Sequence, residues 1–388
     1  QPAENVSLLM QYPPAFTFAT SSMAVATGTN DRWDVGTLAP GQGGTFTFTG
    51  TIVGSVRAQY PITGSVLTDI SGEEYAINSQ PVNFVLVAAP LALSISANGS
   101  STYVSKAGDS INYVLTYTNN SNVTLSSVNI AASLVGAMYD FTTLRTNGAF
   151  NSKTGTVTWY AANAPALTSV APGQSGSVTF SIKTKGSFPI KQLSDKDYTL
   201  GVRGTIQSPT VLPNTSGTST VSVTTAESKM AGDIELASKG YWQSGPYPPA
   251  VNQPTMYTVD WTITNYSTDV KDIAVSAYLQ SGTSFIGTAT STVSSTPLYD
   301  PGTGLITWII PSIAAGTGVA DAPVSASFTV SNTPAVNQVG SDITLLGPTS
   351  LTSTDAFAGG LLLSNAKEIT TALPDDKSLG SGIRQVVQ

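Results

Sequence analysis

A pattern centred on tryptophan occurs three times in this chain, and it constrains the fold more than any other feature. The copies read DRWDVGTLAPGQGGTFTFTG around Trp33, GTVTWYAANAPALTSVAPGQSGSVTFSIK around Trp159 and GLITWIIPSIAAGTGVADAPVSASFTV around Trp308. Each copy has a strand-like segment, a Pro/Gly turn and a second segment in which apolar and polar residues alternate. Alternation with a period of two is typical of half-buried β-strands. The repetition therefore predicts tandem copies of one β domain.

A second repeated segment precedes two of the tryptophans. YVLTYTNNSNVTLSSVNIAASL, residues 113–134, matches YTVDWTITNYSTDVKDIAVSAYL, residues 257–279. Both contain a strand, an Asn/Ser turn and another strand, and no segment has a sustained helical stripe of apolar residues. Short strands separated by frequent turns indicate an all-β fold of tandem Ig-like β-sandwiches. The repeated tryptophans are expected in the cores between the sheets, because they occupy the same phase in every copy.

The repeats also predict the domain boundaries. We expect a partial sandwich over residues 1–89, sandwiches over 90–229 and 230–373, and a tail over 374–388. Val6 aligns with Val128, which lies 37 residues after Leu91, so the equivalent start of the first sandwich would lie about 32 residues before Gln1. The first sandwich is therefore expected to lack its initial two strands.

A sandwich without those strands exposes backbone edges and half of a core, which proteins cover or pair. Either the covering residues belong to a longer precursor, or another molecule supplies the strands by β-augmentation. The tail could be the supplier, because it begins with a linker-like PDDKSLGSG and ends in a strand-like segment. Its candidate inter-subunit strand residues are Ile383, Val386 and Val387. Such a head-to-tail contact does not close, so it would propagate a filament.

Composition excludes many function classes. Cysteine and histidine are absent, so thiolate nucleophiles, Ser-His-Asp triads and His-ligated zinc are excluded. Charged residues make up 10% of the chain and the net charge is −7, which argues against nucleic acid as a partner. The few carboxylates show no opposed pair of the kind a glycosidase needs. We expect no enzyme, no cofactor, no metal and, because the most apolar stretch at 81–96 contains Pro90, no membrane span.

Three motifs together resemble a known family. They are Y-x-x-T-Y-T-N-N-S from Tyr113, G-T-V-T-W ending at Trp159, and the A-P-G-Q-x-G turn before the second strand of each of the first two copies. This combination resembles the Ig-like conserved-repeat domains, the domain-of-unknown-function eleven family, which occur in tandem in prokaryotic cell-surface proteins. The third copy departs from it, with Ala-Ala-Gly-Thr at residues 314–317. The resemblance implies surface stalks, adhesins or fibres and supplies no catalytic residues.

Two further groups of residues are candidates for contacts or modification. The segment GYWQSGPYPPA, with Tyr241, Trp242 and Tyr247, occurs only in the third unit. It could contact a glycan or a neighbouring subunit, or it could cover the joint between the second and third sandwiches. N-glycosylation sequons, which are compatible with an exported, glycosylated surface, start at Asn5, Asn98, Asn119, Asn122, Asn214 and Asn265.

These observations predict an extracellular, cell-surface structural protein. It would be a subunit of a filament, pilus-like fibre or stalk that self-associates through β-strand and inter-domain contacts. One alternative is an adhesin that binds a glycan or a host protein. Another is a set of accessory domains of a larger surface polysaccharide enzyme.

Overall fold

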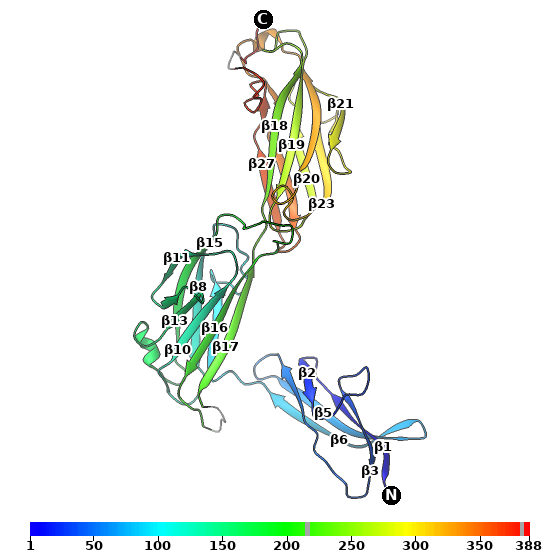
Figure 1. Ribbon diagram of the computed structural model, residues 1–388, viewed down its shortest axis with the longest axis vertical. Helices are drawn as coiled ribbons and strands as arrows, with labels where there is room; N and C mark the ends of the chain where they lie inside the picture. The colour runs from blue at the N-terminus through cyan, green and yellow to red at the C-terminus, as the bar shows by residue number, and fades with distance from the viewer. Residues whose placement is uncertain (214–217, 381–383) are drawn as a thin grey trace. The chain divides into compact units, whose positions relative to one another are not determined.

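The computed structural model describes residues 1–213, 218–380 and 384–388, and these residues form β-strands joined by turns (Figure 1). Within that part of the chain, the helical segments are two short 3-10 turns, Pro165–Thr168 and Val336–Gln338. The chain folds as two compact units, residues 1–92 and 93–388. The predicted all-β fold is confirmed.

The second sandwich consists of two antiparallel sheets. One has the order β11-β15-β8-β7, formed by β7 (Leu91–Ala97), β8 (Ser110–Asn119), β11 (Tyr139–Thr146) and β15 (Ser175–Thr184). The other has the order β12-β13-β10-β16-β17, formed by β10 (Asn129–Val135), β12 (Ala149–Asn151), β13 (Thr156–Trp159), β16 (Thr199–Ser208) and β17 (Thr220–Lys229). A short ladder joins β9 (Leu125–Ser126) to β14 (Ser169–Val170).

The two main sheets of the third sandwich repeat this topology strand for strand. Its sheets have the orders β18-β19-β24-β21 and β22-β23-β20-β26-β27. The strands are β18 (Ile234–Ser244), β19 (Thr255–Asn265), β20 (Val270–Tyr278), β21 (Thr283–Ser291), β22 (Leu298–Asp300), β23 (Leu305–Ile313), β24 (Val324–Asn332), β26 (Thr349–Asp355) and β27 (Leu361–Ala366), with a short pair of β25 (Thr344–Leu346) and β28 (Ile369–Thr370). In immunoglobulin letters, the four-stranded sheets are A-B-E-D and the five-stranded sheets contain C-F-G with an added hairpin beside C.

The first unit contains only part of this topology. Its sheets have the orders β3-β1-β5-β6 and β2-β4, formed by β1 (Ala3–Gln11), β2 (Phe16–Ser21), β3 (Arg32–Leu38), β4 (Phe48–Ile52), β5 (Gln59–Ile70) and β6 (Glu73–Val85). By strand order and by the aligned repeats, β1, β2, β4, β5 and β6 correspond to C, D, E, F and G. Strands A and B have no counterpart in residues 1–92.

The repeated tryptophans are core residues, as predicted. Trp33 on β3, Trp159 on β13 and Trp308 on β23 are completely buried between the sheets. Each indole N–H is paired, to Ser21 Oγ, Asn147 Oδ1 and Ser295 O, respectively. A fourth buried tryptophan, Trp261 on β19, was not part of the prediction.

The second and third sandwiches dock through a short connection, Met230–Asp233. Asp355, which is 1% exposed, accepts the Gly232 N–H at 2.7 Å through Oδ2 and the N–H groups of Phe357 and Ala358 through Oδ1. The charge-assisted hydrogen bond from Gly232 therefore ties the connection to the end of β26, and the other two hold the turn that follows β26.

An acidic turn of the second sandwich also takes part in the docking. Lys196 Nζ lies 2.8 Å from Asp269 Oδ2, and the Asp197 N–H donates to Ser267 O at 2.8 Å. The hydrogen bond from Lys196 lowers the pKa of the Asp269 carboxyl, and the Ala315 N–H that donates to it acts in the same direction. The turn at 194–197 is thus a docking element as well as a solvent-facing loop.

This ion pair predicts a modest pH dependence of the docking. The pKa of Asp269 is lowered in the folded chain. The stabilisation that the ion pair gives to the docking is therefore fully present above the ordinary carboxyl pKa of about 4, and it is lost as the pH falls through the lowered value. Both side chains are more than a third exposed, so the contribution is below about 1 kcal/mol. The protection of the Asp197 amide, measured as its exchange rate relative to the intrinsic rate at the same pH, should fall on acidification, and Lys196→Ala should reduce that response.

The matched control is Lys271→Ala, which removes an exposed lysine of the third sandwich. An equal loss of the pH response in that variant would show that net charge, and not the Lys196–Asp269 pair, produces it.

Candidate functional site

The candidate site is an open apolar groove in the first unit. It has a volume of about 640 Å³ and is lined by Phe16, Phe46, Phe48, Ile52, Ile62 and Phe84, with the backbone of Thr47–Gly50 along one side. The groove lies where strands A and B stand in the complete sandwiches. We call it the A/B groove.

The edge of the groove is a strand that is paired on one side only. The A-P-G-Q turns align Gln42 with Gln174, so Gly43–Thr47 corresponds to Ser175–Thr179. In the second sandwich those residues pair with β8, from Ser175–Thr118 to Thr179–Val114. In the first unit β4 pairs with β2 alone, and Gly43–Thr47 is not part of a strand. The strand is thus shorter than β15 over the residues that correspond to the part of β15 paired with β8.

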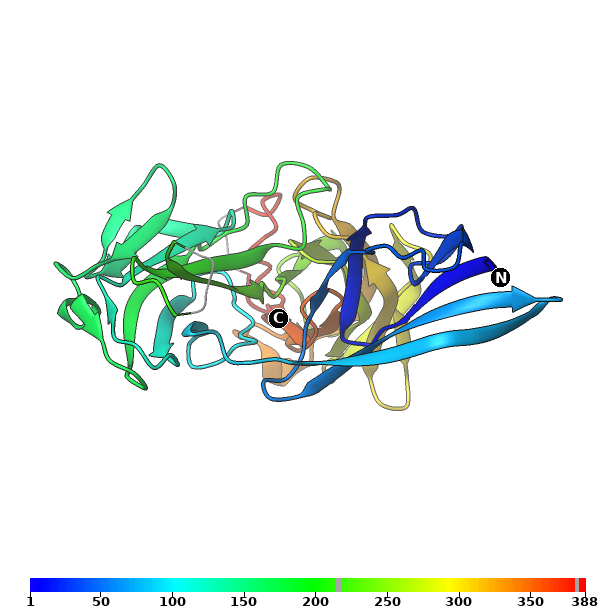
Figure 2. The ribbon, with the colours of Figure 1, turned by 90° about the horizontal axis from the view of Figure 1, so that it is seen from below.

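The floor of the groove is correspondingly exposed. In the second sandwich, β16 buries Leu200, Val202 and Ile206 almost completely. In the corresponding strand β5 only Ile62 and Leu67 are buried, and every residue of β6 is exposed. The long β5–β6 hairpin, also seen in Figure 2, thus presents one face with no covering layer.

Aromatic rings fix the shape of the groove. Phe46 lies 4.6 Å from the Trp33 ring and 5.9 Å from Phe48, and Phe16 stacks on Tyr12 at 4.5 Å. Burial raises the pKa of the Tyr12 phenol to about 12. The packed rings therefore form one continuous aromatic wall of the groove.

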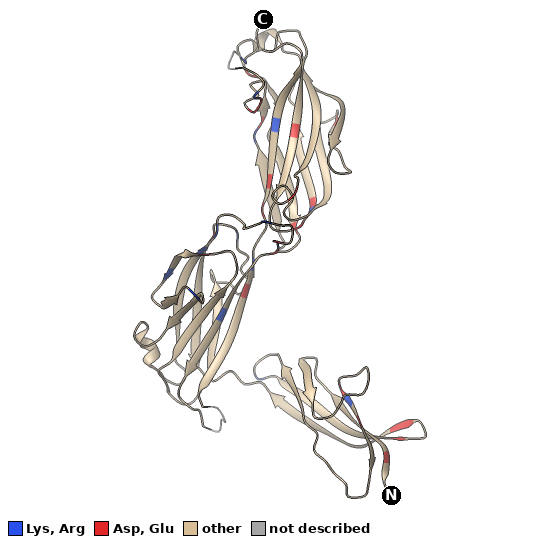
Figure 3. Ribbon diagram, in the orientation of Figure 1, with Lys and Arg blue, Asp and Glu red and all other residues tan. Residues whose placement is uncertain are grey.

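The groove is also free of charge. None of its lining residues is charged, and charged residues are sparse along the ribbon as drawn in Figure 3. What this surface presents is apolar side chains and the main chain of β4.

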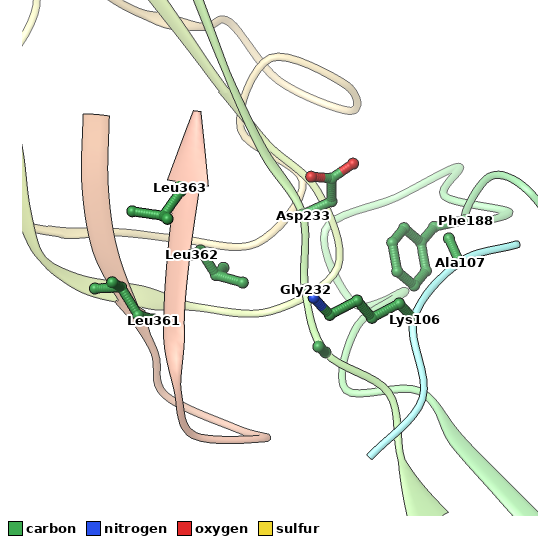
Figure 4. A pocket seen from close by; sticks show the side chains of 9 residues that line it. Lys106, Ala107, Phe188, Gly232, Asp233, Leu361, Leu362 and Leu363 are labelled. Atoms are coloured by element: carbon green, nitrogen blue, oxygen red, sulfur yellow. The ribbon is translucent and has the colours of Figure 1, made fainter. Parts of the chain in front are cut away.

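A second hollow lies at the joint between the second and third sandwiches. It measures about 350 Å³ and is lined by Lys106 and Phe188 on one side and by Leu361–Leu363 on the other (Figure 4). It borders the docking contacts described above, and β27 contributes its apolar wall.

The aromatic segment does not cover that joint. Tyr241 and Trp242 lie at the opposite end of β18, where the Trp242 N–H donates to Asp376 Oδ2 at 2.9 Å. Tyr247 packs against the core of the third sandwich, and its hydroxyl reaches Thr371 O at 3.4 Å. The interpretation that the segment covers the joint was wrong, because β18 carries it away from Asp233. Trp242 is 36% exposed, and its role in glycan or subunit contact stays a prediction.

The described part of the tail is docked on its own sandwich. Val386 is 2% exposed, donates to Ser341 O and accepts from Gly340 N. Val387 forms a parallel bridge with Ala250. The prediction that these two residues form a detached inter-subunit strand was wrong, because their backbone and apolar groups are satisfied within the third sandwich. Ile383 lies outside the described residues.

The sequons divide into surface and structural positions. Asn5, Asn98 and Asn122 are exposed, and Asn214 lies outside the described residues. Asn119 and Asn265 are completely buried. Asn119 Nδ2 donates to Val123 O and Val170 O, and Asn265 Nδ2 donates to Thr268 O, Ile313 O and Ala314 O. Glycosylation of these two was a wrong prediction for the folded chain, because their amides hold the turn after strand B.

Among the residues that the structure describes, no group of three or more acidic residues is placed to hold a metal ion. Nor does any helix within the described ranges have the length and hydropathy needed to cross a membrane.

Comparisons with known proteins give distant structural similarities. No family model matches the sequence, and no curated protein matches it. Similar solved structures include the C-terminal domain of the Streptococcus agalactiae antigen I/II polypeptide BspA, with 9% identity, TM-score 0.27, and coverage of 72% of this chain and 100% of that one. The major pilin SpaD of Corynebacterium diphtheriae has 11% identity, TM-score 0.26, and coverage of 64% and 59%. The S. aureus collagen adhesin has 8% identity, TM-score 0.18, and coverage of 73% and 94%. The fold assignment therefore rests on strand order and register.

Proposed function

We propose that this chain is a non-enzymatic structural subunit of an extracellular, cell-surface fibre or stalk that self-associates through β-strand contacts. The observation that carries the proposal is the A/B groove, in which an apolar sheet face and the edge of Gly43–Gly50 lack the layer that β7 and β8 supply in the second sandwich. An uncovered apolar edge is a site for strand addition, because unpaired backbone groups and apolar side chains both gain from a partner.

Other features support a structural role. Two complete Ig-like sandwiches share one topology, and the Asp355 and Lys196 contacts hold them together. We include membership of the Ig-like conserved-repeat family in the proposal, since G-T-V-T-W forms β13 and the A-P-G-Q turn leads into β15. We propose the exposed sequons at Asn5, Asn98 and Asn122 as the positions of N-linked glycans.

Electron microscopy of the purified, untagged chain at rising concentration tests this function. We expect filaments with a regular repeat above a threshold concentration, because each added copy covers an exposed groove. Isolated particles at every concentration would contradict the proposal. The comparison at 0.15 M and 1 M salt is a useful control, since apolar strand contacts should persist where exposed ion pairs are screened.

A further inference from the structure

A polar groove lies on the outer face of the sheet that β18, β19, β24 and β21 form in the third sandwich. It has a volume of about 410 Å³, which is within the range of about 300–1,000 Å³ that is usual for small-molecule sites. Apart from Pro323 and Ala326, every residue that lines it carries a hydroxyl or a carboxylate. A ligand that fits this lining must itself be polar. We call this hollow the Asp260 groove.

The polar side chains of the groove form two rows across three strands. Asp260 and Thr262 of β19 pair with Ser327 and Ser325 of β24, respectively. On the other side of β24, Ser327 pairs with Thr290 of β21. Directly paired residues of antiparallel strands point to the same face of a sheet, and along β19 these positions alternate with buried ones. The side chains therefore gather on one outward face.

The central polar groups of the groove are available to a ligand. Among the described residues, the half-buried Asp260 carboxylate has no hydrogen bond and no ion pair, although Lys239 is its cross-strand neighbour on β18. The hydrogen bonds formed at Ser325 and Ser327 use the main-chain groups of these residues. Their hydroxyls, like the carboxylate, are thus free to bond a molecule in the groove.

The second sandwich has a groove at the corresponding place, but its lining differs. Phe180 and Phe328 occupy the same position of the repeat, and Val114 and Asp260 each lie one residue beyond the cross-strand partner of that phenylalanine. The groove of the second sandwich measures about 530 Å³ and contains Val114 together with Arg145. The hollow therefore follows from the shared topology, whereas the carboxylate is particular to the third sandwich.

This set of groups suits a neutral sugar. Adjacent hydroxyls of a sugar ring can donate to both oxygens of one carboxylate, and such charge-assisted hydrogen bonds are stronger than neutral ones. Serine and threonine hydroxyls both donate and accept, so they can bond further ring hydroxyls. An anionic sugar would be repelled by the charge of Asp260.

An aromatic residue lies beside the groove on the same face. Tyr241 of β18 is paired with Thr258, in the row next to that of Asp260. Its ring offers an apolar surface with a polar tip, which can cover the apolar face of a sugar ring. This position gives Tyr241, one of the residues that the sequence singles out for glycan contact, a defined neighbouring site.

We propose that the Asp260 groove binds a neutral glycan. The Asp260 carboxylate accepts hydrogen bonds from adjacent ring hydroxyls, Ser325 and Ser327 bond further hydroxyls, and Tyr241 covers one end of the glycan. This is a binding function in addition to the proposed role as a fibre subunit, and it does not depend on assembly.

Titration of the full chain with defined sugars tests the proposal. The probes are maltotriose, cellotriose, mannotriose and chitotriose, with sialyllactose as the anionic counterpart, and saturation-transfer NMR reports binding. At least one neutral trisaccharide should bind, and sialyllactose should not. Asp260→Asn keeps the shape of the side chain and removes its charge, so it should weaken binding at least about tenfold. Ser325→Leu should abolish binding, because leucine fills the groove.

Two variants are matched controls. Glu235→Gln removes the same charge from the same face of β18 and β19, at a residue that does not line the groove. Arg145→Ala alters the corresponding groove of the second sandwich. Both variants should bind the trisaccharide as the unaltered chain does, and circular dichroism verifies that all four variants are folded.

Three results would overturn the proposal. The first is that no neutral trisaccharide binds. The second is binding that Asp260→Asn and Ser325→Leu leave unchanged, which would place the sugar elsewhere on the chain. The third is a preference for sialyllactose that Lys239→Ala removes, which would make the ligand an anionic glycan. Filament formation enters none of these outcomes, so the fibre function and the glycan site stand or fail separately.

Discussion

Replacing Trp308 with alanine should lower the free energy of unfolding of the third sandwich by about 3–5 kcal/mol. The indole is completely buried between the two sheets and packs in one cluster with Trp261, Phe328 and the apolar residues of β19 and β20. Its removal loses the transfer free energy of the ring and leaves a cavity that the surrounding strands cannot fill. The Ser295 carbonyl also loses its donor. Amide hydrogen exchange in β19 and β20 measures the loss for this sandwich alone.

Trp242→Ala is the matched control, because it removes the same side chain from the same sandwich. Trp242 is 36% exposed, and it is the main-chain N–H of this residue that donates to Asp376 Oδ2. The expected cost is below about 1 kcal/mol. Equal losses for the two variants would mean that Trp308 does not have the core role assigned to it.

Asn119→Ala should lower the free energy of unfolding of the second sandwich by about 2–4 kcal/mol. The buried amide donates to Val123 O and Val170 O, and its oxygen accepts from Ser121. Alanine leaves these groups without that partner in a site closed to water, and each buried unsatisfied group costs about 1–3 kcal/mol. In this variant, hydrogen exchange of the amides near β9 and β14 should be the first to become faster, because the Asn119 side chain connects the turn to Val170.

Asn122→Ala tests the same turn at an exposed position three residues away. It should change the free energy of unfolding by less than about 0.5 kcal/mol. If the two substitutions have similar effects, the buried hydrogen bonds of Asn119 do not hold this turn.

Much of the architecture follows from local pattern. Alternating apolar residues predicted the strands because one face of each is buried, and the repeated phase of the tryptophans predicted their core position. Trp261 was missed because the repeated pattern was centred on another strand. The alternation of Tyr257, Val259, Trp261 and Ile263 along β19 is the signal that could have identified it.

The errors concern contacts between distant segments. The sequon pattern at Asn119 and Asn265 is identical to that of a surface sequon, and only the fold shows the amides enclosed by carbonyls from residues far along the chain. Their alignment in two repeats is the signal for a structural role. The position of Val386 against Ser341 likewise depends on tertiary packing, so a linker-like composition before it suggested a free tail.

The connection at Met230–Asp233 determines how the second and third sandwiches would respond to tension. It joins β17 directly to β18. β17 pairs with β16 from Thr199–Lys229 to Ser208–Thr220, and β18 pairs with β19 over a similar span from Ile234–Asn265. A pull along these strands loads each ladder in shear, so its hydrogen bonds resist together and do not open one at a time. A chain without disulfides thereby gains mechanical resistance from strand length and direction.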